Sequence, residues 1–164
     1  RWRVTRLARV LVDESLREVE RNRQPAVLAE ASAMFERVTR GRYSRVVQNE
    51  GDERVAVVDA SGRRLRLRDL SRGTAEQLYL CIRLGFALEF GRKAEPLPLV
   101  MDDVLVNFDA KRARSMAAEL LEVAARNQIL LFTCHGFTRD LFAEAGPRVR
   151  LVDLVDGVVA TAGV

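Results

Sequence analysis

Two adjacent carboxylates, Asp102 and Asp103, directly follow the apolar run Leu99–Met101. Pro96 and Pro98 precede this run, so we expect a short buried strand that ends at the acidic pair. Ligands of open α/β sheets bind at the carboxyl ends of the strands. There, one carboxylate can hold Mg²⁺, directly or through water, and the other can orient or deprotonate an attacking water. The pair therefore predicts a metal-assisted hydrolytic site.

Alternatives to this site can be weighed from the neighbouring residues. Receiver domains also gather Asp residues at strand ends, but they need a lysine at the end of a later strand, and neither Lys93 nor Lys111 is so placed. Asn107 and Asp109 lie between the acidic pair and a helix expected over 110–126. Aspartate is a favoured helix N-cap, so a capping role and a functional role both remain open for Asp109.

A third polar segment, Leu70–Gln77, enters a helix expected over 75–91. Ser71 offers a hydroxyl, and Gly73 allows a ligand to approach the backbone closely. The free N–H groups of a helix start carry partial positive charge, which suits the segment to bind an anion. A plain Ser or Thr N-cap explains the same pattern and remains open.

The chain's one histidine, His135, follows the apolar run Ile129–Cys134. We expect a strand over 129–133, buried on both faces beside a parallel neighbour, the acidic-pair strand. His135 is then expected near the acidic pair. We interpret Cys134 as a packed thiol, because nothing nearby in sequence would lower its pKa.

The elements that position these residues change in type along the chain. Apolar spacing indicates an N-terminal helical region, an antiparallel section with a strand of alternating Leu and Arg, and an α/β region from residue 70. Besides the elements above, we expect helices over 3–23, 26–39 and 137–145, strands over 45–48, 54–58 and 63–67, and a closing hairpin of 149–154 and 158–160.

Length and composition limit the classes of protein. The 164 residues, 48% of them hydrophobic, suffice for one domain or one lobe of a larger one. No apolar run reaches the roughly 18 residues of a membrane span, and no signal peptide is recognisable. Two cysteines provide neither a disulfide framework nor a zinc site alone, so we expect a reducing, cytoplasmic location.

Positive charge is concentrated in the first part of the chain. Residues 1–72 carry 17 basic and 11 acidic side chains, whereas residues 73–164 carry 10 and 12. A basic surface of this kind can meet phosphates, and an ordinary solvated surface explains it equally. Within it, the alternation over 63–68 displays Arg64, Arg66 and Arg68 on one face, where they could contact a DNA backbone.

Taken in order, the motifs resemble those of the C-terminal lobe of ABC-type ATPases, in their SMC-like branch. Leu70–Gln77 resembles the signature motif, Leu99–Asp103 the Walker B motif, Val106–Asp109 the D-loop and His135 the switch histidine. The wording Leu-Ser-Arg-Gly-Thr-Ala-Glu-Gln-Leu-Tyr-Leu, Met-Asp-Asp-Val-Leu-Val-Asn-Phe-Asp and Phe-Thr-Cys-His is most similar to bacterial YhaN-like proteins, relatives of the SbcC subunit of the SbcCD nuclease. The resemblance covers about residues 20–155.

The resemblance implies an α/β fold, the C-terminal half of an ABC-type (P-loop NTPase) head with a small antiparallel section. Residues 1–40 would be helices at the base of a coiled-coil arm, and residues 41–164 the ATPase lobe. Asp102 would support Mg²⁺, Asp103 would stand at the position of the catalytic base and His135 would sense the γ-phosphate. The resemblance also implies that Asn107 and Asp109 communicate across a dimer, and that ATP held by the opposite subunit is contacted by signature residues Ser71, Arg72, Gly73, Thr74 and Gln77.

Two departures from the family pattern shape the functional expectation. Most ABC ATPases have Glu where this chain has Asp103, whose shorter side chain needs a bridging water or a different pose to act as the base, so we expect slow turnover. The chain contains no G-x-x-x-x-G-K-[ST] motif, so we expect the Walker A lobe to lie upstream in a longer polypeptide.

The resemblance implies a set of partners and a role. We expect a homodimeric second head, DNA, a metallophosphoesterase nuclease subunit, no membrane, and a role in DNA repair, recombination or chromosome maintenance. An ATP-gated clamp on DNA or protein, with little hydrolysis, is the alternative.

Overall fold

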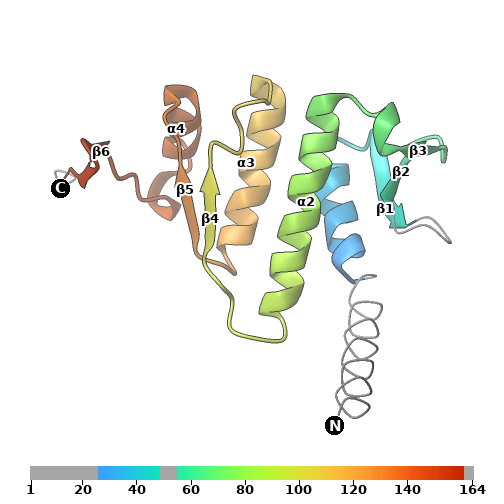
Figure 1. The fold of residues 1–164 in the computed structure, drawn as a ribbon, viewed down its shortest axis with the longest axis horizontal. Coiled ribbons are helices and arrows are strands. Elements are labelled where there is room, and N and C mark those ends of the chain that lie inside the picture. The colour runs from blue at the N-terminus through green and yellow to red at the C-terminus, as the bar shows by residue number, and fades with distance from the viewer. Residues whose placement is uncertain (1–25, 49–54, 161–164) are drawn as a thin grey trace, which may run out of the picture. The chain divides into compact units, whose positions relative to one another are not determined.

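The structure, a computed structural model, describes residues 26–48 and 55–160 (Figure 1). The chain divides after Pro96 into two compact units. The helix expected over 3–23, and with it most of the expected arm, lies outside the described residues. Within the described ranges, no helix combines the length and the apolarity that crossing a membrane requires.

The described part of the first unit contains two helices and a small sheet. Its elements are a helix at residues 26–38, β1 (Tyr43–Gln48), β2 (Val55–Asp59), β3 (Arg64–Arg66), the 3₁₀ turn η1 (Leu67–Asp69) and α2 (Arg72–Gly91). The strands form one antiparallel sheet in the order β1-β2-β3. These elements confirm the helices expected over 26–39 and 75–91 and the antiparallel section between them.

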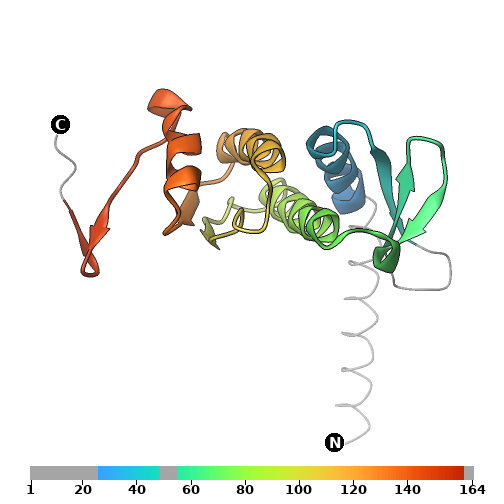
Figure 2. The ribbon, with the colours of Figure 1, turned by 90° about the horizontal axis from the view of Figure 1, so that it is seen from above.

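The two helices of this unit lie side by side (Figure 2). Gly85 of α2 makes the close approach possible: a Cβ atom there would lie 2.8 Å from the carbonyl oxygen of Val27 and 3.2 Å from the amide nitrogen of Ala31. An ion pair between Arg92 and Glu30 joins the same two helices further along. The first helix buries Val27, Ala31, Met34, Phe35 and Val38, which are the apolar face expected from the sequence.

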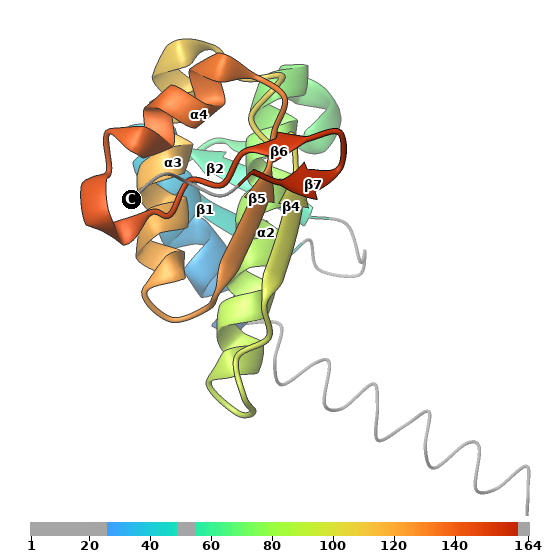
Figure 3. The same cartoon turned by 90° about the vertical axis from the view of Figure 1, so that its left-hand side faces the viewer.

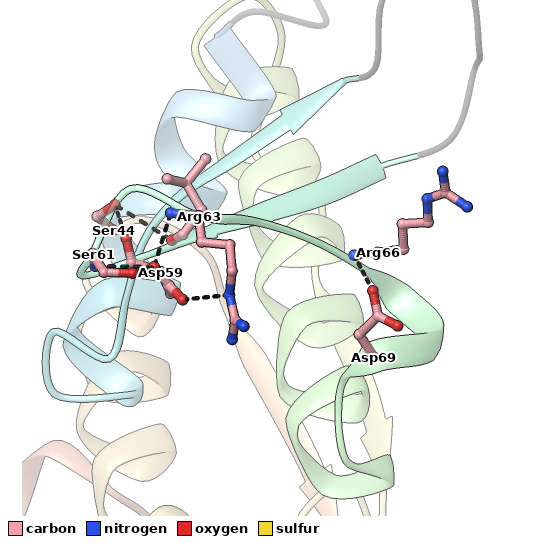
Figure 4. Close-up of polar contacts among 7 residues, drawn as sticks. Ser44, Asp59, Ser61, Arg63, Arg66 and Asp69 are labelled. Atoms are coloured by element: carbon pink, nitrogen blue, oxygen red, sulfur yellow. Dashed lines mark hydrogen bonds and ion pairs between the residues drawn. The ribbon is translucent and has the colours of Figure 1, made fainter.

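The sheet is tied to the first helix and closed by a polar turn. Ser32 accepts a 2.8 Å hydrogen bond from the amide of Val46 in β1. In the β2–β3 turn, Oδ1 of Asp59 accepts hydrogen bonds from the amide and hydroxyl of Ser61 and from the amide of Arg63 (Figure 4). These bonds hold the pKa of Asp59 below its usual value, the Ser61 hydroxyl contributing most.

The third strand is shorter than the sequence pattern predicts. The strand expected over 63–67 ends at Arg66, because the carboxylate of Asp69 accepts a 2.9 Å bond from the amide of Arg66 and draws the chain into η1 (Figure 4). The alternation itself is confirmed: Arg64, Arg66 and Arg68 are exposed, and the intervening leucines are half-buried.

The second unit has the α/β pattern expected from the sequence. Its elements are β4 (Leu99–Asp102), α3 (Ala110–Ala124), β5 (Ile129–Phe132), α4 (Gly136–Ala143), η2 (Gly146–Arg148), β6 (Leu154–Val155) and β7 (Val158–Val159). Strands β4 and β5 lie side by side and run parallel (Figure 3). Asp102 lies opposite Phe132 at their carboxyl ends. Helix α3 buries Ala113, Met116, Ala117, Leu120 and Val123 along one side.

Two expectations for this unit need correction. The strand β5 is not buried on both faces, because Leu130 and Phe132 are 44% and 46% exposed. Val100 of the neighbouring β4 is 69% exposed. Successive side chains of a strand point to opposite faces, so one face of the β4–β5 pair is left uncovered within the described part of the chain. The closing hairpin is also shorter than expected, with two-residue strands joined by the expected turn at Asp156 and Gly157.

Candidate functional site

The acidic pair lies at the carboxyl end of β4, as expected. Asp102 is the last residue of the strand and is exposed. Asp103 follows with a left-handed backbone (φ +46°), and its amide donates a 3.0 Å hydrogen bond to the carbonyl of Phe132 at the end of β5. Aspartate tolerates the left-handed region better than longer side chains do, so the backbone itself favours Asp over Glu at position 103.

The parallel register brings the loop after β5 against Asp103. The hydroxyl of Thr133 donates a 2.7 Å hydrogen bond to Oδ1 of Asp103 and accepts a 3.1 Å bond from the amide of His135. Oδ2 of Asp103 faces the Nε2 atom of His135 at 3.7 Å and the Sγ atom of Cys134 at 3.5 Å. The structure therefore unites Asp103 and His135, as the sequence predicted.

These neighbours keep the carboxylate charged. The hydrogen bond from Thr133 contributes most to holding the pKa of Asp103 below its usual value, and the bond from Cys134 and the nearby His135 act in the same direction. The hydrogen bond that Cys134 donates to Asp103 also raises the pKa of the Cys134 thiol, because a thiolate could not donate this bond and would stand beside a carboxylate. The site thus combines an ionised carboxylate with a protonated thiol.

The geometry suits a positioned, partly accessible base. The side chains of Asp103 and His135 are 31% and 45% exposed, so water and a phosphate can reach both. One carboxylate oxygen is held by a hydrogen bond from Thr133, and the other faces the imidazole. The carboxylate oxygens of the exposed Asp102 and the partly exposed Asp103 are of the kind that Mg²⁺ prefers, so the donor set fits that ion.

The D-loop candidates lie between β4 and α3. Asp109 is the N-cap of α3: its carboxylate accepts a 2.9 Å bond from the amide of Arg112 and pairs with the guanidinium of the same residue at 3.2 Å. The capping role left open by the sequence is therefore present. Asn107 is exposed in the preceding turn.

The signature candidates form the start of α2 in the first unit. Ser71 is the N-cap, accepting from the amide of Thr74 at 3.3 Å and sharing a 2.8 Å hydrogen bond with its hydroxyl. Arg72 is exposed and pairs with Glu76 at 3.0 Å. This cap explains why the helix begins three residues before the expected position.

Exposure separates the signature candidates into two groups. Ser71 and Arg72 are exposed and Gly73 is partly exposed, so a ligand can reach them from solvent. Thr74 and Gln77 are 3% and 1% exposed and face the interior of their unit. The Nε2 atom of Gln77 has no hydrogen-bond partner within the described structure.

Sequence reasoning missed two members of the site. Thr133 was placed in a strand without a role, and Cys134 was interpreted as packed, whereas Cys134 is exposed beside Asp103. Neighbours in sequence alone do not reveal this contact. Pairing the two apolar runs in parallel with their ends aligned would have placed residues 133–135 opposite Asp103, because parallel strands end at the same edge.

Comparison with known proteins finds a sequence relative of the kind that the motifs resemble. No protein-family profile matches the chain. The chain is 32% identical over 144 residues to the uncharacterized protein YhaN of Bacillus subtilis (strain 168). This match covers 87% of the chain but only 15% of YhaN, so the chain spans a small part of its relative's length.

Solved structures extend this comparison to the fold. A structure from a study of ATP-driven dimerization and DNA-stimulated activation of SMC ATPases matches 88% of the chain and 86% of its own length, with 17% identity and a TM-score of 0.64. The SMC head domain from Thermotoga maritima matches 87% of the chain and 49% of its own length, with 16% identity and a TM-score of 0.59. These likenesses show that the chain has the α/β fold of SMC head domains, and that its sequence is similar to a part of YhaN, as its motifs indicated.

Proposed function

We propose that this segment supplies the signature and Walker B parts of a composite ATPase site. The observation that carries the proposal is the position of the Asp103 carboxylate at the end of β4, held by Thr133 and facing His135 at 3.7 Å. Hydrolysis of a phosphoanhydride needs positioning of water and stabilisation of charge more than covalent chemistry. A fixed carboxylate and an imidazole at one sheet edge provide both.

Each candidate site residue of the second unit has a proposed task. Asp103 orients and polarises the attacking water through its accessible oxygen, and His135 hydrogen-bonds the γ-phosphate. Asp102 holds Mg²⁺, directly or through water; when bound, the ion neutralises phosphate charge. Because the side chain of Asp103 is short, a second, bridging water links its oxygen to the attacking water. Asn107 and Asp109 transmit the state of this edge to a second head.

The start of α2 is proposed to bind the γ-phosphate of ATP held by the opposite head. The exposed Ser71 hydroxyl and the backbone around Gly73 donate to the phosphate, and Arg72 adds positive charge. Thr74 and Gln77 are buried, so they shape the helix start from inside and do not touch the nucleotide. Of the five signature residues expected from the sequence, only Ser71, Arg72 and Gly73 are therefore proposed to contact the nucleotide.

The proposal requires further parts. A Walker A lobe of the same polypeptide would hold the β- and γ-phosphates, and a second copy of the head would complete the sandwich. ATP binding then joins the heads and hydrolysis releases them, which yields a conformational cycle acting on DNA. DNA repair, recombination or chromosome maintenance, and a metallophosphoesterase nuclease partner, follow from the resemblance to SbcC. The two free thiols support a reducing, cytoplasmic setting.

The test is Mg²⁺-dependent phosphate release by the full-length protein and its variants. Asp103→Asn keeps the shape but removes the charge, and His135→Ala removes the imidazole; each should lower kcat by about 10²-fold or more. Asp140→Asn removes an exposed carboxylate of α4 and serves as the charge-matched control. Unchanged turnover in the first two variants would remove the assigned roles.

An ATP-gated clamp is the second candidate. It is favoured by one observation: the shorter Asp103 already has one oxygen engaged by Thr133, which limits its reach toward a water. Single-turnover hydrolysis by the complete head dimer separates the two functions. Product above background within minutes supports the ATPase, and bound ATP that persists for hours supports the clamp.

A further inference from the structure

The loop after β5 and the residue after β4 bring together three different metal-ligating side chains. One ligand atom each from Asp103, Cys134 and His135 lies within 4.8 Å of the other two. All three belong to the second unit, and Cys134 and His135 are exposed, so an ion could enter from solvent. We propose that these residues form a site for a thiophilic divalent cation, Zn²⁺ by its chemistry, with solvent in the fourth position.

Two of the three distances between donor atoms are close to those around a tetrahedral ion. Zinc bonds of about 2.3 Å to sulfur and about 2.0 Å to nitrogen and oxygen place tetrahedral ligands about 3.3 to 3.5 Å apart. The Oδ2 atom of Asp103 lies 3.5 Å from Sγ of Cys134 and 3.7 Å from Nε2 of His135. Small side-chain shifts bring the three atoms onto one ion.

The surrounding contacts pre-orient two of the ligands. Thr133 donates to Oδ1 of Asp103, which leaves Oδ2 turned toward the thiol and the imidazole. The same hydroxyl accepts from the amide of His135 and fixes the start of that loop. Hydrogen bonds of this kind set the orientation and affinity of metal ligands, so Thr133 is a positioning residue of the site.

The donor set also selects the metal. Mg²⁺ prefers an all-oxygen octahedron, whereas thiolate and imidazole favour zinc. On binding, the Cys134 thiol releases its proton to solvent and its sulfur bonds the ion, with no change of oxidation state. The ion would occupy the oxygen of Asp103 that the proposed ATPase uses, so filling the site blocks hydrolysis; this consequence, unlike the site itself, rests on the proposed function.

Cobalt binding to the chelator-treated full-length protein tests the site without any activity measurement. Co²⁺ in a tetrahedral site with thiolate gives a near-ultraviolet charge-transfer band, and added Zn²⁺ should abolish it. We expect Cys134→Ser to lose a band that Cys81→Ala, the matched change of the buried cysteine, retains. Thr133→Val should weaken binding about 10- to 100-fold. An identical band in the parent and in Cys134→Ser would overturn the proposal.

The regulatory consequence is measured separately. Zn²⁺ should inhibit ATP hydrolysis by the parent, and a chelator should restore the activity. The Cys134→Ser variant should hydrolyse ATP at the same rate with and without Zn²⁺. If the parent shows the cobalt band but no ATPase activity, the site stands and the proposed function fails. If ATPase activity is present and Zn²⁺ inhibits both proteins equally, the proposed regulation is wrong.

Discussion

The hydroxyl of Thr133 donates a 2.7 Å hydrogen bond to the carboxylate of Asp103, which lies 30 positions earlier in the chain. The bond joins the ends of two neighbouring strands. This bond is the largest cause of the lowered pKa of Asp103. The carboxylate therefore stays ionised to lower pH than an ordinary aspartate does. It also keeps one orientation, because Oδ1 is engaged and Oδ2 is left for other groups.

Removing this hydroxyl should change the pH dependence of the proposed ATPase. Thr133→Val preserves the shape of the side chain, but the pKa of Asp103 should rise once its main hydrogen bond is lost. A base with a raised pKa loses its charge at higher pH, so the acid limb of the kcat–pH profile should move to higher pH. Ser115→Ala, which removes a hydroxyl on α3, is the control. An unshifted acid limb would show that Asp103 does not govern this limb.

Ser71 should have separable roles in stability and in activity. Ser71→Ala removes the N-cap of α2 and should lower the free energy of unfolding by about 1 kcal/mol. Ser71→Asp supplies an equally good cap, so stability should be retained, but its negative charge would face the γ-phosphate. We expect ATPase activity of the Asp variant to fall more than about tenfold, since like charges in contact are strongly unfavourable. If Ser71→Asp were fully active, Ser71 would be a cap alone.

Local sequence signals predicted the elements of this fold well, and long-range pairing less well. The apolar face of the helix at 26–38 and the turn at Asp156-Gly157 are set by residues near in sequence, so spacing sufficed. The extent of β3 was missed because a single contact from Asp69 ends it. The coverage of β5 was missed because burial of a strand depends on neighbours that its own sequence does not specify.

The same distinction between local signals and long-range pairing applies to the residues of the candidate site. Asp103 and His135 were predicted because residue type and position after an apolar run already indicate a sheet edge. The contribution of Thr133 and the exposure of Cys134 depend on the β4–β5 register, which pairs Asp102 with Phe132. The burial of Gln77 likewise depends on which side of α2 faces the interior. Motif spacing predicted which segments meet, and packing determined which of their atoms are available.

Packing in the first unit can be tested through two glycines of α2. Gly85→Ala should be destabilising by about 1 to 3 kcal/mol, because the new Cβ would lie 2.8 Å from the backbone oxygen of Val27 and force the helices apart. Gly91→Ala is the matched control: its Cβ would meet Pro96 at 3.5 Å, an ordinary contact, and alanine favours the helix. Urea unfolding should therefore give changes of opposite sign. Equal effects would contradict the close helix approach.

The exposed arginines of the β3–η1 segment, Arg64, Arg66 and Arg68, should contribute to DNA binding through phosphate contacts. Each contact releases condensed counterions, so the triple change to Ala should reduce the slope of log K against log salt by up to about 2.7 for duplex DNA. The charge-matched control replaces three exposed arginines elsewhere in the chain, Arg83, Arg114 and Arg126. We expect the control to leave the slope nearly unchanged, because arginines that do not contact phosphates release no condensed counterions on binding. Equal slopes for the parent and both triple variants would assign the β3–η1 arginines to an ordinary solvated surface.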